Sequence, residues 1–245
     1  MRLRPSPTLA LTLAGALLAA CDARDEAPAM SEAPATVDTL ATARPTVTYL
    51  ALGDSYTVGE SVPQAASFPY QLSDSLTARG YGVAEVTVIA RTGWRSDVLL
   101  AALDERDTGP APNLVTLLIG VNDQFQGRDV EGFRQNFVRL LDRAEGLAVD
   151  GRGDVVVVTI PDYSATPFAA SRDTARIRRE LDVFNAVLTE EAGARGLPVV
   201  DITPGSKAAR ERPGELLAAD RLHPSGVQYG QWVTEMLPSV VAALE

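Results

Sequence analysis

One serine stands where a strand is predicted to end, and one distant histidine could act as its base. The apolar run from Tyr49 to Leu52 stops at Gly53-Asp54-Ser55. A serine hydroxyl is a weak nucleophile until a neighbouring base takes its proton. The chain has a single histidine, which lies in Asp220-Arg221-Leu222-His223-Pro224. Because Asp220 can reach the imidazole within a turn, these residue types predict a triad of Ser55, His223 and Asp220.

Two further polar motifs follow predicted strands, as Ser55 does. Gly93 comes shortly after an apolar run that ends at Ala90, and Asn122 follows one that ends at Ile119. Because the carboxyl ends of parallel strands meet at one edge of a sheet, both groups should lie near Ser55. The backbone N–H groups of Ser55 and Gly93 and the side-chain amide of Asn122 could then stabilise a developing oxyanion.

Each of these residues also has a purely structural interpretation. A Gly-Asp-Ser sequence is usually a turn, a lone glycine often marks a loop, and Asn122 and Asp123 could serve as turn and helix-cap residues. A single histidine is more often a surface or core residue than a catalyst. The occurrence of all these motifs at strand ends or loops favours catalysis. We expect Asp54 and Asp123 to hold their turns by hydrogen bonds.

The apolar pattern predicts strands that alternate with helices from residue 46 onward. The predicted strands are 46–52, 85–90, 113–119, 154–160 and 197–202, and the predicted helices are 68–79, 98–103, 129–144, 174–194 and one that opens at Ser225. Gly146 should end the third helix, and Pro238 should kink or interrupt the last. The alternation predicts an α/β fold: a three-layer α/β/α sandwich with a mostly parallel five-stranded sheet in one domain, 46–245.

The amino-terminal segment has the pattern of an export signal. Arg2 and Arg4 precede an apolar run that is too short to span a bilayer and that closes in Leu18-Ala19-Ala20-Cys21. This resembles the lipobox of bacterial lipoproteins and predicts a signal peptide over 1–20, lipidation of Cys21 and an extracytoplasmic, membrane-anchored protein. An ordinary secretory signal or an N-terminal anchor remains the alternative. Residues 21–45 are rich in Ala, Pro and acidic residues, which predicts a flexible linker.

Charge and composition argue against several partners. The 245 residues include 22 Lys and Arg against 32 Asp and Glu, a formal net charge of −10. No basic stripe occurs, so a nucleic-acid partner is not expected. The sequence also contains neither a glycine-rich phosphate loop nor a clustered ligand set, so a phosphate- or metal-dependent enzyme that uses Asp54 is disfavoured.

Taken together, the motifs resemble the SGNH (GDSL-type) hydrolases. Gly53-Asp54-Ser55, Gly93, Gly120-Val121-Asn122-Asp123 and Asp220-Arg221-Leu222-His223-Pro224 match the four family blocks in family order. The resemblance implies a flavodoxin-like α/β/α fold, no metal or organic cofactor, and ester hydrolysis through an acyl-serine. One departure is Tyr56, which stands where the nominal motif has leucine.

Two function classes remain open at this point. The first is a serine esterase that acts on an acyl ester, a lysophospholipid, a thioester or an O-acetyl glycan. The second is a non-catalytic envelope binding lipoprotein on the same fold. Trp94, Tyr163 and Phe168 could wall a substrate pocket or simply pack against the sheet edge. The charged helix faces around Arg176, Arg178, Arg179 and Glu180 are interpreted as solvated surface.

Overall fold

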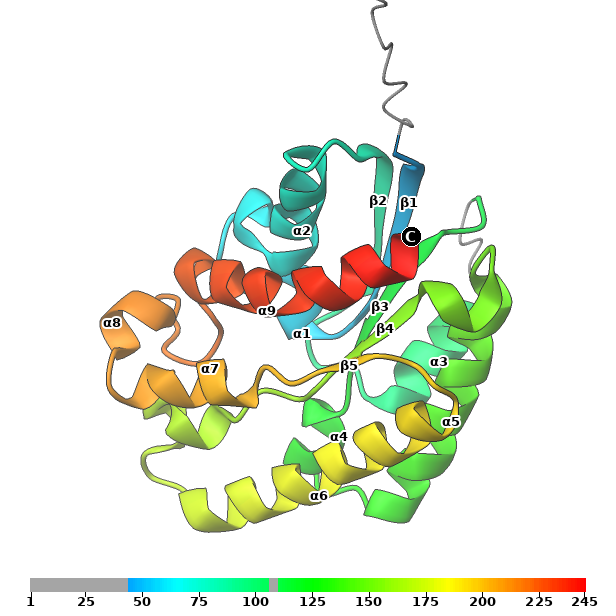
Figure 1. The fold of residues 1–245 in the computed structure, drawn as a ribbon. Helices are drawn as coiled ribbons and strands as arrows, with labels where there is room; N and C mark the ends of the chain where they lie inside the picture. Colours follow the sequence, from blue (N-terminus) through cyan, green and yellow to red (C-terminus); the bar gives the residue numbers. More distant parts are fainter. Residues whose placement is uncertain (1–43, 106–109) are drawn as a thin grey trace, which may run out of the picture. The chain divides into compact units, whose positions relative to one another are not determined.

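A parallel sheet of five strands forms the centre of the protein, which we describe from a computed structural model (Figure 1). The structure describes residues 44–105 and 110–245, all within one compact unit, Thr42–Glu245. The predicted signal peptide 1–20, Cys21 and residues 21–43 of the predicted linker lie outside the described residues. The strands are β1 Thr46–Gly53, β2 Gly82–Ala90, β3 Leu114–Leu118, β4 Val155–Val158 and β5 Val199–Val200.

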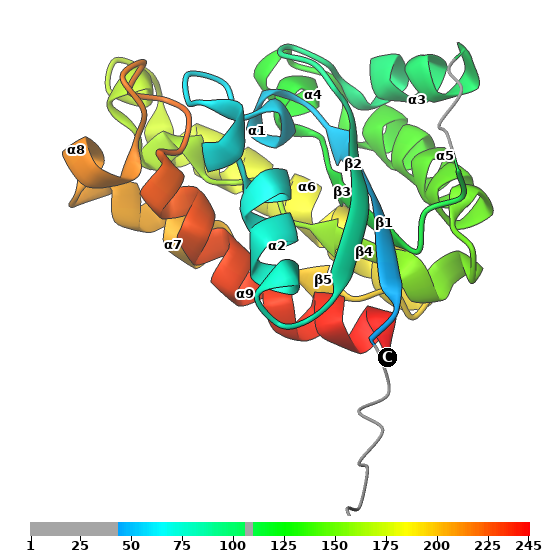
Figure 2. The ribbon, with the colours of Figure 1, turned by 90° about the horizontal axis from the view of Figure 1, so that it is seen from above.

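Helices cover both faces of the sheet, which confirms the predicted three-layer sandwich. Figure 2 shows α2 (Phe68–Thr77) and α9 (Gly226–Leu244) on one side and α3 (Ser96–Glu105) and α5 (Val130–Leu147) on the other. Helix α6 (Thr174–Ala194) packs against α5. The inner strands β3 and β4 are buried along their whole length, as expected for parallel strands with helices on both faces.

The strand order is β2-β1-β3-β4-β5, with every pairing parallel. The chain leaves β1 toward β2 and returns to place β3 on the other side of β1. Such a reversal opens a crevice at the carboxyl ends of the strands, where α/β proteins bind their ligands. Ser55 follows β1 directly, so the fold puts it at this crevice.

The remaining elements are short. Four helices of one or two turns are α1 Ser55–Val58, α4 Val121–Phe125, α7 Thr203–Lys207 and α8 Pro213–Leu216. The 3-10 helices are η1 Gln64–Ala66, η2 Gly151–Asp154, η3 Tyr163–Ala165, η4 Pro167–Ala169 and η5 Ala208–Arg210. The sequence did not predict these elements, because they are too short to show an apolar period.

Several elements differ in their bounds from the sequence predictions. Helix α5 passes Gly146 and ends at Leu147, because a glycine inside a helix costs only about 1 kcal/mol and packing outweighs it. Helix α9 continues through Pro238, so an interruption there is wrong, while a kink stays a prediction; Met236 and Val240 on either side of the proline are buried in the core. Strand β5 has only two residues, Val199 and Val200, in place of the predicted 197–202, and it pairs with β4 alone.

Candidate active site

Ser55 is the first residue of α1, which turns off the end of β1 without a loop. The side chain of Asp54 caps this helix by accepting a 3.0 Å hydrogen bond from Tyr56 N–H. A Cβ at position 53 would lie 2.1 Å from Thr57 Oγ1 and 2.4 Å from the Leu118 carbonyl oxygen. Only glycine therefore lets the turn fold this tightly against β3, and the turn presents Ser55 at the sheet edge.

The structure brings Ser55, His223 and Asp220 into one hydrogen-bonded chain. His223 Nε2 lies 2.9 Å from Ser55 Oγ, and His223 Nδ1 lies 2.6 Å from Asp220 Oδ2. Both contacts are within hydrogen-bond distance, and the second closes over only three residues of sequence. A carboxylate on Nδ1 favours the tautomer that leaves Nε2 able to accept the serine proton.

The loop that carries His223 is shaped by Asp220. Asp220 Oδ1 accepts hydrogen bonds from the backbone N–H groups of Leu222 and His223, at 2.9 and 3.0 Å. Between them Arg221 adopts a left-handed conformation with φ +63°. The loop is tied to the segment around α8 by the Ala218 N–H, which donates to the His223 carbonyl at 2.8 Å. The same carboxylate thus sets both the backbone turn and the imidazole orientation.

Asp220 is held in its charged form. Partial burial alone would raise the pKa of this carboxyl, but hydrogen bonds from Ser61, His223 and the two backbone amides together outweigh it and lower the pKa to about 2. Asp220 therefore stays ionised throughout the neutral range and can stabilise a positive charge on His223.

Ser61 is a further residue in this network that sequence reasoning missed. Its Oγ donates a 2.7 Å hydrogen bond to Asp220 Oδ2, the oxygen that also meets His223. Ser61 has φ +66°, a left-handed backbone conformation that is unfavourable for most residues other than glycine. Its isolated position in a loop carried no signal, because only the fold joins it to a residue 159 positions away.

Removal of the Ser61 hydroxyl is expected to slow turnover without weakening substrate binding. Ser61→Ala should lower kcat about tenfold with KM unchanged, since a hydrogen bond to a charged group contributes roughly 1.5–3 kcal/mol and Asp220 keeps its other partners. Ser61→Gly serves as the control, because it relieves the backbone strain but also lacks the hydroxyl. Equal kcat for wild type and both variants would contradict this role.

Gly93 and Asn122 lie beside Ser55 at the same sheet edge, where all three border one cavity. Gly93 has φ +84°, which turns the chain sharply after β2. The backbone N–H groups of Ser55 and Gly93 have no acceptor among the described residues. Asn122 Nδ2 donates to the Trp94 carbonyl oxygen at 2.9 Å. Since an amide nitrogen carries two hydrogens, this bond orients the side chain and leaves a second donor.

Asp123 joins the two loops that carry these donors. Its carboxylate accepts hydrogen bonds from Ser96 N–H at 2.9 Å and from Ser96 Oγ at 2.6 Å. Burial raises the pKa of Asp123, and the two bonds from Ser96 oppose this rise. Because Ser96 begins α3 and Asp123 lies in α4, the contact fixes the Gly93 loop relative to Asn122.

Asp54 is fully buried, and burial raises its pKa to about 8 against the opposing hydrogen bond from Tyr56 N–H. Its Oδ2 has no hydrogen-bond partner within the described part of the chain. The Asp54 carboxyl therefore binds a proton more tightly in the folded protein than in the unfolded chain, where its pKa is near 3.8. The stability that protonated Asp54 contributes is present below pH 4 and is lost as the pH rises through about 8.

We expect Asp54→Asn to remove this pH dependence while keeping an oxygen that can cap α1. The unfolding free energy of the wild type should fall relative to that of the variant as the pH rises from about 4 to about 8. Urea denaturation at several pH values measures the difference. A difference that stays constant across this range would show that Asp54 does not titrate there.

A small apolar cavity of about 190 Å³ opens beside Ser55. Its lining consists of Ser55, Tyr56, Thr92, Gly93, Val121, Asn122, Phe125, Tyr163, Phe168, Leu222 and His223. Two of the three aromatic candidates, Tyr163 and Phe168, are therefore part of the wall. Trp94 does not line the cavity and packs against the hydrophobic core instead, while its carbonyl orients Asn122.

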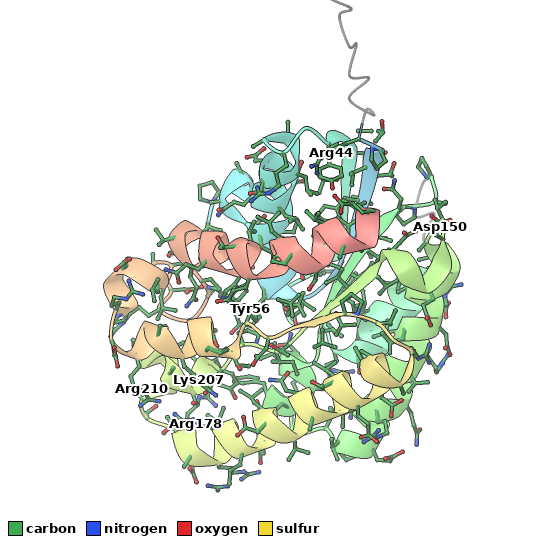
Figure 3. All side chains as sticks on the ribbon, in the orientation of Figure 1. Arg44, Tyr56, Asp150, Arg178, Lys207 and Arg210 are labelled. Carbon is green, nitrogen blue, oxygen red and sulfur yellow. The ribbon has the colours of Figure 1, made fainter. Side chains whose placement is uncertain are left out.

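Tyr56, the departure from the family motif, lies next to the candidate base. Its ring centroid is 5.3 Å from that of His223 and 6.2 Å from that of Trp232 in α9. Figure 3 labels this residue just below α9. Tyr56 therefore supports the imidazole from behind and also forms part of the cavity wall.

Residues 44–105 and 110–245 contain neither a cluster of metal ligands nor a membrane-spanning helix. No three side chains of His, Cys, Asp or Glu among them converge in a way that could hold a metal ion. None of the helices in these ranges is long and apolar enough to cross a membrane.

Comparison with known proteins places the chain in a family. Residues 51–230 match the model of the GDSL-like lipase/acylhydrolase family. No curated protein sequence matches the chain. The chain belongs to the GDSL-like lipase/acylhydrolase family and is a hydrolase that acts on ester bonds. This membership decides between the two open function classes in favour of an enzyme.

Solved structures share the fold. A lipase from a goat rumen metagenome has 21% identity and a TM-score of 0.65, covering 82% of this chain and 100% of its own. The lipase/acylhydrolase from Enterococcus faecalis has 24% identity and a TM-score of 0.60, covering 80% and 95%. A mutant of Axe2, an acetyl-xylooligosaccharide esterase from Geobacillus, has 19% identity and a TM-score of 0.61, covering 81% and 95%. At these identities the likeness concerns the fold.

Proposed function

We propose that the protein is a serine esterase that hydrolyses carboxylic esters through an acyl intermediate on Ser55. The observation that carries this proposal is the hydrogen-bonded chain from Ser55 Oγ through His223 to Asp220, at 2.9 and 2.6 Å. A nucleophile, a base and an orienting carboxylate in this arrangement are the requirements for acyl transfer.

The reaction proceeds in two halves. Ser55 Oγ bonds to the ester carbonyl carbon while its proton passes to His223 Nε2. The bond to the alcohol oxygen then breaks, and the alcohol leaves with that proton. Water then attacks the acyl-serine and gives one proton to His223 Nε2. The bond between the acyl carbon and Ser55 Oγ breaks, His223 returns that proton to Oγ, and the carboxylic acid leaves. Asp220, whose pKa of about 2 keeps it ionised, stabilises the imidazolium in both halves.

The negative charge on the substrate carbonyl oxygen needs donors in each half. The N–H groups of Ser55 and Gly93 and the free hydrogen of Asn122 Nδ2 are suited to this role. Asn122→Ala should lower kcat by about 10²–10³-fold, the usual loss for one oxyanion donor. Asn122→Asp, which keeps the shape but replaces the donor by an acceptor, should lose at least as much. Near-normal kcat in Asn122→Asp would exclude the residue from the oxyanion hole.

The size of the cavity supports a short acyl group. At about 190 Å³ it is smaller than the roughly 300–1,000 Å³ of sites that hold drug-sized ligands. We expect kcat/KM on p-nitrophenyl esters to be highest for acetate or butyrate and to fall toward palmitate. The series tests both parts of the proposal. Activity that rises toward palmitate would contradict the short-acyl assignment, and no enzymatic hydrolysis at any length would contradict the esterase assignment.

We further propose that the enzyme is a lipoprotein, exported and anchored to a membrane through Cys21. The support is the sequence pattern, in which the single cysteine follows Leu18-Ala19-Ala20. In the producing cells, a fatty-acid label should enter the wild type, and the mature chain should begin at Cys21. Cys21→Ala should lose the label. A labelled Cys21→Ala variant, or an unlabelled wild type, would contradict the anchor.

A further inference from the structure

A large groove of about 870 Å³ adjoins the cavity beside Ser55. It runs between the α4–α5 region and α6, and it shares Phe125 and Tyr163 with the cavity. Its lining consists of Gln124, Phe125, Gly127, Arg128, Val130, Tyr163, Arg172, Asp173, Arg176, Ile177, Arg179, Glu180, Val183 and Phe184. The groove and the cavity are therefore neighbours, with the Phe125 and Tyr163 rings lining both.

The groove is rich in arginine, although the chain as a whole is acidic with a net charge of −10. Four arginines line it, at positions 128, 172, 176 and 179, against the carboxylates of Asp173 and Glu180. The charged residues that the sequence predicts to be solvated surface therefore fall into two groups. Arg176, Arg179 and Glu180 face the groove, whereas Arg178 lies 3.4 Å from the buried carboxylate of Asp162.

Two of these arginines lack a direct ion pair within 44–105 and 110–245, although the charge of Arg179 helps to lower the pKa of the Glu180 carboxyl. Arg176 pairs with Glu180 at 2.6 Å, and Arg128 lies 3.7 Å from Asp97. Arg172 and Arg179 form no ion pair with any described residue. A guanidinium presents several N–H donors in a planar fork that matches a carboxylate or phosphate. The groove therefore offers donors that the protein itself leaves available.

Arg172 stands where the groove meets the cavity. Its guanidinium carbon lies 4.9 Å from the ring centroid of Phe125 and 5.0 Å from that of Phe168. Both rings also line the cavity beside Ser55, and both are unusually exposed for phenylalanine, at 43% and 37%. Stacking on these rings holds the cation at the rim and leaves its edge for a ligand.

We propose that this groove is a subsite for an anionic group on the alcohol half of the ester. The proposal rests on the esterase function, because the short acyl group fills the small cavity and the rest of the substrate must lie outside it. The recognised chemistry is a carboxylate or a phosphate attached to the alcohol. An acidic sugar carries the first and a phosphorylated sugar the second.

Matched synthetic esters test the proposal. The probes are meta-acetoxybenzoate and its longer homologue meta-acetoxyphenylpropionate, each compared with its neutral primary amide. The phosphate counterpart, meta-acetoxyphenyl phosphate, distinguishes the two sources of negative charge. We expect kcat/KM to be about threefold to tenfold higher for the better anionic ester than for its amide. Added salt should reduce this ratio, since the arginines are solvent-exposed.

The same ratio of kcat/KM, anionic ester to neutral amide, is measured for arginine variants. Arg172→Ala and Arg179→Ala should each lower the ratio, and the double variant should bring it close to one. Arg172→Ala also removes stacking on Phe125 and Phe168, so its effect combines lost charge with lost packing. Arg179 stacks on no aromatic ring within the described residues, so Arg179→Ala reports the loss of charge without that loss of stacking. Arg79→Ala, at the end of α2 near the amino ends of the strands, should leave the ratio unchanged.

The outcomes separate this inference from the esterase proposal. Suppose that the wild type hydrolyses the acetyl ester of the amide-bearing probes. If kcat/KM is then no higher for the anionic esters, or if the arginine variants do not lower the ratio, the subsite proposal is wrong and the esterase proposal stands. If Ser55→Ala hydrolyses the acetyl ester of the neutral probes as fast as the wild type does, the esterase proposal itself is wrong. A preference for phosphate over carboxylate would assign the phosphorylated sugar, and the reverse order would assign the acidic sugar.

Discussion

Ser55→Ala is expected to lower kcat on p-nitrophenyl acetate by about 10⁴-fold or more. The reason is that the variant lacks the atom that forms the acyl bond, so only the oxyanion donors and binding remain. This loss corresponds to roughly 5.5 kcal/mol in the activation free energy. The variant should fold normally, because the Ser55 side chain contacts its hydrogen-bond partner His223 and borders an open cavity.

The control for this prediction is a serine away from the site. Ser239 lies in the last turns of α9, and Ser239→Ala should keep wild-type kcat. Circular dichroism and thermal denaturation should be similar for all three proteins. If a well-folded Ser55→Ala enzyme kept more than about a tenth of the wild-type kcat, the acyl-serine mechanism would be excluded for this substrate.

His223→Ala should be almost as damaging, with a loss of about 10⁴-fold or more in kcat. Without the imidazole, no other side chain in the described part of the protein is hydrogen-bonded to Ser55 Oγ and able to accept its proton. Because His223 is the only histidine of the chain, no other histidine can substitute for it. Steady-state kinetics on the same ester measures the effect.

Two further measurements make the His223 prediction specific. The double variant Ser55→Ala/His223→Ala should be no worse than either single variant, since residues that act as a unit lose their effect together. Added imidazole should restore part of the activity to His223→Ala but none to Ser55→Ala. Strictly multiplicative losses in the double variant would mean that the two residues act independently.

The central features of the site could be predicted from the sequence because they depend on strand ends. Ser55, Gly93 and Asn122 each follow a buried or half-buried strand, and parallel pairing alone brings such positions to one edge. Asp220 could be paired with His223 because three residues separate them. A contact between residues far apart in the sequence could not be predicted in this way, since only the folded loops bring Ser61 to Asp220.

The cavity and the groove were harder to predict for a related reason. Phe125 and Leu222 line the cavity from loops or short helices, where no apolar period marks the inward-facing side chain. Arg172 and Arg179 belong to charged stretches whose sequence is typical of solvated surface. Only the packing of α6 beside α4 and α5 shows that Arg179 faces the same groove as Phe125.

The errors in the secondary-structure predictions also have a physical cause. Glycine and proline are weak terminators when a long apolar face is already held by its neighbours, as at Gly146 in α5 and Pro238 in α9. The predicted outer strand was too long, because Leu197 and Ile202 are buried although neither belongs to the two-residue strand β5.

Covalent labelling of the nucleophile tests the central claim most directly. A p-nitrophenyl alkylphosphonate should release one equivalent of p-nitrophenol per enzyme, and activity should disappear in proportion. Mass spectrometry of the digested protein should find the phosphonyl group on Ser55, with no label in Ser55→Ala. Loss of activity with the label on another residue, or full activity after complete labelling of Ser55, would contradict the acyl-serine mechanism.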